Sequence, residues 1–95
     1  METRVAVISI IIENKDSIET LNHLLHEASD YIIGRMGIPY RQKGISIISI
    51  AIDAPQDTIS TLSGKIGRLK GVSAKTAYSN VITKIESNPN GGHTL

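Results

Sequence analysis

The chain of 95 residues contains no cysteine, no tryptophan and no phenylalanine. Without cysteine it forms neither a disulfide framework nor a thiolate metal site, and we expect a cytoplasmic, reducing location. No segment approaches the roughly 20 apolar residues that a membrane-spanning helix needs, so we expect no membrane partner. The 10 Lys and Arg against 9 Asp and Glu leave a net charge of only +1, and this overall field does not attract nucleic acid.

The chain is long enough for one domain, but a domain of this length has a small core and limited stability of its own. A domain of this size buries only about 60 to 65% of the surface that its unfolded chain exposes. Burying more surface against a partner is therefore an accessible source of stability, and self-association is expected before any motif is considered.

Two segments rich in β-branched residues, 4–12 and 45–52, are apolar at both odd and even positions. Strands that are covered on both faces have this composition. Weaker strand signals flank a connection over 37–44 that contains two glycines and a proline. Four strands are predicted, over residues 4–12, 31–36, 45–52 and 72–78.

Apolar residues recur every three to four positions in two further segments, which predicts helices over about 16–29 and 53–70. Asp53 is expected to cap the second helix, with Gln56 three residues later completing a capping box. Gly71 stands where a left-handed residue would end that helix. Gly64 and Gly67 are interpreted as points of close packing between helix and sheet.

This order of elements predicts an α+β, ferredoxin-like βαββαβ domain over residues 1–79, with a partly disordered tail over 80–95. The four-stranded antiparallel sheet would carry both helices on one face, with the first and third strands in its centre. The other face would expose Ile and Val over more than the roughly 300 to 600 Å² patch that monomers tolerate. We expect a second subunit to cover it, although the C-terminal segment folding across it is the alternative.

Signs of catalysis are scarce. No phosphate-binding loop, nucleophile motif or carboxylate pair is recognisable, so we predict that the protein is not an enzyme and assign no cofactor. His23 and His26, three residues apart on the first helix, would be able to share a metal ion at an interface. Both lack the further ligands that complete a site, and two solvated histidines are the simpler interpretation.

The most unusual segment, 31–44, gathers three cations and two tyrosines. Its glycines allow a ligand or a neighbouring subunit to approach the backbone, and its arginine forks suit a carboxylate or a phosphate. A polar hairpin with incidental charge is the alternative. The candidate ligand-binding residues are Gly34, Arg35, Met36, Gly37, Pro39, Tyr40 and Arg41.

The string from Gly34 to Arg41 resembles the iron-only hydrogenase system regulator family, together with Arg4–Ile8, Gly64–Leu69 and Gly71–Ser73. The resemblance extends from Arg4 to about Ser79. It implies an ACT-like domain, similar to the metal-sensing C-terminal domain of the nickel-responsive repressor, that forms side-by-side dimers and often tetramers. It also implies a role in regulating hydrogenase maturation or expression.

The nickel repressor's ligand set is only partly matched. His26 falls on one of its metal-ligand positions, whereas Gly37, Pro39 and Ile45 stand where the other three ligands would be. The resemblance therefore implies at most a metal contact at His26, and we expect the region near Gly37 to take an organic or anionic ligand instead. We expect that the repressor's DNA-binding arm is missing here.

Together these features predict a homo-oligomeric regulatory domain that senses a small ligand at a subunit interface. The alternative is a regulator that binds DNA, through another protein or directly. A small enzyme that uses His23, His26, Tyr31 or Tyr40 is a third hypothesis. The cations available for direct DNA binding are Arg35, Arg41, Lys43, Lys65, Arg68 and Lys70.

Overall fold

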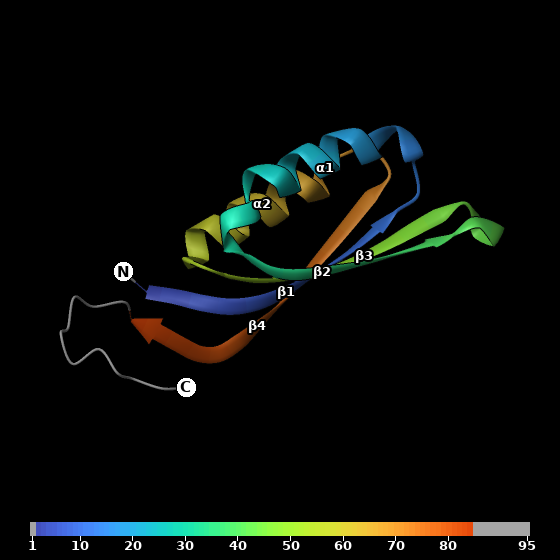
Figure 1. The fold of residues 1–95 in the computed structure, drawn as a ribbon. Coiled ribbons are helices and arrows are strands. Elements are labelled where there is room, and N and C mark those ends of the chain that lie inside the picture. Colours follow the sequence, from blue (N-terminus) through green and yellow to red (C-terminus); the bar gives the residue numbers. More distant parts are fainter. Residues whose placement is uncertain (1, 85–95) are drawn as a thin grey trace.

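The structure is a computed structural model that describes residues 2–84. It is a four-stranded antiparallel sheet with two helices on one face (Figure 1). The elements are β1 (Glu2–Ile12), α1 (Ile18–Glu27), β2 (Ile32–Tyr40), β3 (Ile45–Ala54), α2 (Gln56–Gly67) and β4 (Val72–Lys84). Short 3-10 turns lie at η1 (Lys15–Ser17), η2 (Ser29–Tyr31) and η3 (Arg41–Lys43).

The strand order β2-β3-β1-β4 places the first and third strands in the centre of the sheet. This order and the shared helical face confirm the predicted α+β, ferredoxin-like fold. In the part of the chain that the structure describes, no helix is long and apolar enough to cross a membrane.

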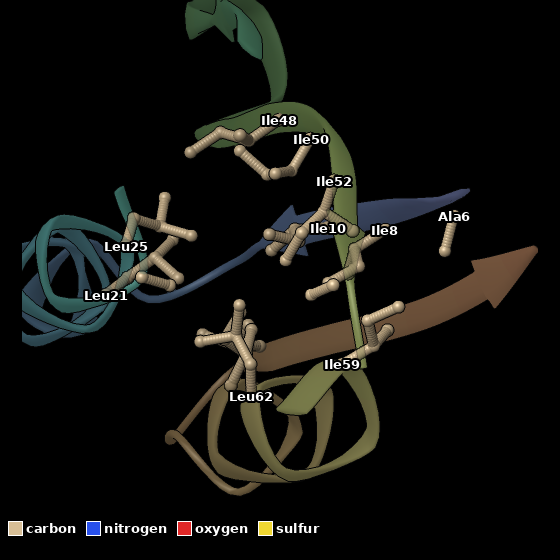
Figure 2. Packing of buried hydrophobic residues seen from close by; sticks show 14 of the residues in the cluster. Ala6, Ile8, Ile10, Leu21, Leu25, Ile48, Ile50, Ile52, Ile59 and Leu62 are labelled. Atoms are coloured by element: carbon tan, nitrogen blue, oxygen red, sulfur yellow. The ribbon is translucent and has the colours of Figure 1, made fainter. Parts of the chain in front are cut away.

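The core lies between the helices and one face of the sheet. Alternate residues of β1, from Ala6 to Ile12, are buried there, and β3 contributes Ile50 and Ile52 beside them. Figure 2 shows leucines of α1 and an isoleucine and a leucine of α2 directed at these strands. The largest fully buried side chains are all branched aliphatic ones, Ile8, Ile10, Ile12, Leu21, Leu25, Ile50, Ile52, Ile59 and Ile66.

The sheet face that points away from the helices is called the open face below. Most of its large apolar residues are substantially exposed, from 38% at Val7 to 61% at Met36, whereas Ile45 and Ala51 are half-buried. Residues directly opposite on neighbouring strands share a face, so the strand register defines which residues belong to it. The open face comprises Gly34, Met36, Ile38 and Tyr40 of β2, Ile45, Ile47, Ser49, Ala51 and Asp53 of β3, Val5, Val7, Ser9 and Ile11 of β1, and Ser73, Lys75 and Ala77 of β4.

The start of α2 differs from the prediction. Asp53 is the penultimate residue of β3, and Pro55 occupies the N-cap position without a side-chain hydrogen bond. The capping-box prediction was wrong because pairing of Asp53 with Val5 across the sheet extends β3 past the expected cap.

The link from α2 to β4 depends on a glycine, as predicted, although α2 itself ends earlier, at Gly67. Gly71 has a φ of +69°, and a Cβ at that position would lie 2.6 Å from the Cβ of Asn14. Its carbonyl accepts a 2.7 Å hydrogen bond from the backbone of Glu13, which ties this link to the end of β1. The close-packing interpretation of Gly64 and Gly67 was wrong, because a Cβ at Gly64 meets only the Arg68 guanidinium and one at Gly67 meets nothing within 4 Å.

The last strand is longer than expected and continues to Lys84. It pairs with the start of β1 after a register shift opposite Val5. Arg4 spans this irregularity, since its Nε donates to the Ser79 carbonyl at 2.7 Å and its guanidinium lies 4.9 Å from the Tyr78 ring centroid. Residues 80–84 of the expected tail therefore belong to the sheet, and residues 85–95 lie outside the described part of the chain.

Candidate functional site

Strand β2 is the most exposed strand of the sheet. Ile32 is half-buried, and every residue from Ile33 to Tyr40 is exposed. The strand pairs only with β3, so its other backbone edge has no sheet partner within residues 2–84. Such an edge tolerates Pro39, which lacks an amide donor, and this is why the strand continues through the segment predicted to be a connection.

Because β2 is a strand here, its candidate ligand-binding residues divide between two faces. Those opposite Ala51, Ser49 and Ile45 belong to the open face, and those opposite Ile50, Ile48 and Ser46 lie on the helical side. The open-face members are Gly34, Met36 and Tyr40, and the helical-side members are Arg35, Gly37 and Pro39. Arg41 follows the strand in η3. The predicted set is therefore a strip along one edge of the sheet.

Arg35 is the charged residue within this strip. Its Nη2 donates to Oδ1 of Asn22 on α1 at 3.3 Å, and the side chain is exposed. The sole ion pair within residues 2–84 joins His23 to Glu27, at 3.9 Å, so the guanidinium of Arg35 has no carboxylate partner there. Most of its donors remain available to an anion.

The two glycines of the strip have space around them. A Cβ built at Gly34 meets nothing within 4 Å, and one at Gly37 meets only Cγ1 of Ile48, at 3.9 Å. Neither has a positive φ. The fold of a single copy therefore does not require glycine at either position, and the space they leave open faces outward.

Sequence reasoning missed a second feature, a groove of about 390 Å³ between the two helices. Its apolar lining comes from Leu24, Ala28 and Leu62, and the charged groups around it include Asp57 and Lys65. The residues recur at helical spacing just beside the buried stripes of α1 and α2. That spacing alone is also the normal border of an amphipathic helix, so it carries no specific signal.

The histidine pair on α1 is exposed. His23 Nε2 lies 3.9 Å from Oε1 of Glu27, and His26 is on the solvent side of the same helix. Among the residues that the structure describes, no group of three or more His, Asp or Glu side chains is placed to hold a metal ion. A metal contact at His26 would need ligands from elsewhere, and it stays a prediction.

The six predicted DNA-contacting cations do not form one row. Arg41 and Lys43 lie in η3 beside β2, whereas Arg68 and Lys70 lie in the link that enters β4. Strands β2 and β4 form the opposite edges of the sheet, and three strand spacings of ~4.8 Å separate them by about 15 Å. The two groups share one end of the molecule, beyond Ile12 and its partners.

The chain was compared with known proteins. The TM1266-like family model, described as an iron-only hydrogenase system regulator on a provisional basis, matches residues 4–76. Uncharacterized protein TM1266 from Thermotoga maritima is a similar structure, with 34% identity and a TM-score of 0.77, and the match covers 80% of this chain and 96% of that one. No curated protein matches.

A second solved structure shows likeness in fold alone. A formyltetrahydrofolate deformylase from Pseudomonas putida KT2440 is 14% identical with a TM-score of 0.61, over 81% of this chain and 29% of that one. The family match spans all the elements from β1 into β4 and includes the whole β2 strip. On these matches, the chain belongs to the TM1266-like family of iron-only hydrogenase system regulators.

Proposed function

We propose that this protein is a non-catalytic regulatory domain that assembles with copies of itself and senses a small anionic ligand at a subunit interface lined by Gly34–Arg41. The family's regulatory description supports the general role. The exposure of β2 is the observation that carries the specific one. An edge strand with eight consecutive exposed residues leaves both side chains and backbone available to a ligand or a neighbour.

The chemistry of the strip favours an anion. Arg35 presents a planar fork without a carboxylate partner in the described chain, and Arg41 lies one residue beyond the end of the same strand. The open space at Gly37, on the same side of the strand as Arg35, lets a carboxylate or phosphate reach backbone groups beside the fork. Met36, which is 61% exposed, would contact the remainder of an organic ligand.

Native mass spectrometry of the full chain, purified without an affinity tag or chelator, tests this proposal. An even-numbered oligomer that retains additional mass is the expected result, and the mass identifies the ligand. Arg35→Ala should lose that mass, while Arg35→Lys, which keeps the charge but not the fork, should retain only part of it.

Arg68→Ala is the matched control, because it removes an exposed arginine beside β4, at the opposite edge of the sheet from the β2 strip. It should leave any bound mass unchanged. A wild-type oligomer without bound mass, or equal loss from Arg35→Ala and Arg68→Ala, would refute ligand sensing at this strip.

Direct DNA binding is the alternative function, supported by the exposed cations at one end of the molecule. Lys43 and Arg68 have no ion-pair partner within residues 2–84. Binding of this kind releases counterions, so its affinity for promoter DNA must fall steeply with salt. A gel shift at low and at raised salt measures this, and absence of any salt-sensitive complex would exclude it.

A further inference from the structure

We propose that a second copy of this chain covers the open face, sheet against sheet, with the strands of the two copies antiparallel and β2 lying over β2 of the partner subunit. This inference rests on the self-assembly in the proposed function and specifies its surface and orientation. It follows from the order of side chains on the open face.

The strand register arranges the centre of the open face as three rows that cross all four strands. Each row contains one residue from β2, β3, β1 and β4, in that order. The large row is Ile38, Ile47, Ile11 and Ser73, the middle row is Met36, Ser49, Ser9 and Lys75, and the small row is Gly34, Ala51, Val7 and Ala77. Neighbouring rows are about 6.6 Å apart, two residues along a strand.

In the antiparallel arrangement the two-fold axis runs along the middle row. Rotation about it places the large row of one copy on the small row of the other. Ile38 then faces Gly34 of the partner subunit, and Ile47 faces Ala51 of the partner subunit. Ile11 faces Val7 of the partner subunit and Ser73 faces Ala77 of the partner subunit, so large side chains meet small ones on β2 and β3. Large side chains opposite small ones allow two faces to interdigitate. The middle row meets itself, which puts the hydroxyl-bearing Ser9 and Ser49 against their own copies.

The parallel orientation, with an axis along the strands, lacks this complementarity. It would place β3 over β1 of the partner subunit and each row over itself, so that Ile47 meets Ile11 of the partner subunit. In the next row Gly34 would face Ala77 of the partner subunit, two small residues that leave a void, and Ala51 would face Val7 of the partner subunit. Alternating overcrowding and empty space favour the antiparallel orientation.

The size of the open face suits a second copy. Four strands at ~4.8 Å and about nine residues at ~3.3 Å give roughly 600 Å² per copy, or roughly 1,200 Å² for the pair. That is at the lower end of specific protein interfaces, which start at about 1,200 Å². The face is mostly apolar. Its two charged residues lie at its border, Lys75 on the edge strand β4 and Asp53 in the last row of β3, where both side chains reach water.

This orientation also completes the proposed ligand site. With β2 over β2 of the partner subunit, both exposed strips lie along one rim of the interface. Met36 meets its own copy there, and Arg35 projects beside the rim from the helical side of the strand. An anion at this rim is then within reach of two strips, whereas a single copy offers one.

Sedimentation velocity on the full chain over a concentration series tests the orientation with three proteins. Wild type should dimerise or form a larger even-numbered assembly. Ala51→Ile places a branched side chain in the small row, and its two symmetric clashes should raise the dimer dissociation constant about 30-fold or more. Thr20→Ile, at an exposed position of α1, is the matched control and should dimerise like wild type.

The double variant Ile47→Ala/Ala51→Ile decides the orientation. In the antiparallel dimer it exchanges the large and small positions of β3, so the new alanine faces the new isoleucine of the other copy. Dimerisation should then return to within about 5-fold of wild type. In the parallel dimer the two changes face different residues and their losses add. Far-UV circular dichroism should show wild-type secondary structure for all variants, because both positions face outward.

Each outcome decides between supporting and overturning the inference. A double variant that remains as weak as Ala51→Ile overturns the antiparallel orientation, and a wild-type assembly indifferent to Ala51→Ile overturns the open face as its surface. Ligand binding is measured independently by native mass spectrometry, so a wrong orientation and a missing ligand are distinguishable. A wild-type monomer at micromolar concentration removes this inference together with the self-assembly on which it rests.

Discussion

The two faces of the sheet carry similar side chains in different surroundings. On β1, Ile10 is fully buried beneath the helices, whereas the next residue, Ile11, is 44% exposed on the open face. On β3 the same contrast separates Ile48 from Ile47. The two faces therefore do not differ in amino-acid type. They differ in the elements that pack against them.

Strands that are apolar on both faces therefore indicate two different packing partners. The helices supply one, and their leucines and isoleucines complete a core with the buried face. The other face has no cover within residues 2–84, yet it retains the composition of a buried surface. The predictions below test this contrast, beginning with the largest expected effect.

Matched truncations on the two faces of β1 break the comparison most directly. Ile10→Ala should reduce the free energy of unfolding by about 2 to 5 kcal/mol, because it opens a cavity under the helices. Ile11→Ala should cost less than about 1 kcal/mol at concentrations where the protein is monomeric, and more as concentration rises. Urea unfolding at two protein concentrations measures both. Equal, concentration-independent losses would contradict the contrast.

Two glycines with similar positive φ values compare a turn that is packed against its neighbours with one that is not. Gly71→Ala should cost about 2 to 3 kcal/mol, because a Cβ at φ +69° also meets Asn14 at 2.6 Å. Gly44→Ala in the β2–β3 turn has φ +65° but nothing within 4 Å, so only the backbone cost of about 1 to 2 kcal/mol applies. Thermal unfolding compares them, and a larger loss at Gly44 would be inconsistent with this packing.

Arg4, whose side chain is held by two hydrogen bonds, is compared next with the exposed Arg35. Arg4→Ala should cost about 1 kcal/mol, since it removes a 2.7 Å bond to the Ser79 carbonyl and one to Gln56 at 3.1 Å. Arg35→Ala, with a single 3.3 Å bond at the exposed edge, should change stability by less than about 0.5 kcal/mol. Chemical denaturation measures both losses. Comparable losses would mean that Arg35 supports the fold and is not free for a ligand.

The smallest effect concerns the single charge in the rows of the open face. Lys75 would lie beside its own copy at the rim of the antiparallel dimer. Lys75→Gln removes that repulsion and should strengthen dimerisation by a few tenths of a kcal/mol, about 2-fold, with the gain declining as salt rises. Sedimentation at low and high salt detects it. Weakened dimerisation would place Lys75 in a favourable contact.

The fold was predictable because hydrophobic periodicity and turn residues agree along the chain. The β-branched segments predicted the central strands, and the three-to-four-residue periodicity predicted both helices. Element ends were less predictable. Asp53 has the chemistry of a helix cap, yet strand pairing with Val5 retains it in β3, because cross-strand hydrogen bonds outweigh one capping contact.

The candidate site was predictable as a set of residues but not as an arrangement. Gly34, Arg35 and Arg41 were identified from charge and glycine content, and they lie along one exposed edge. The division of these residues between two faces was not predictable. Gly37 and Pro39 favour a turn in isolation, and a strand accommodates them only at a sheet edge. The groove between the helices was missed, since its lining matches an ordinary amphipathic border.

The sequence by itself determined the element types, the central position of the two isoleucine-rich strands and the left-handed glycine at 71, because each depends on local backbone preference or on periodicity. Only the tertiary structure decided which face of each strand the helices cover, where each strand ends and which residues align in rows across the sheet. Those features depend on pairing between strands far apart in sequence. One-residue shifts of that register would exchange the buried and open faces, and no local preference records which register the chain adopts.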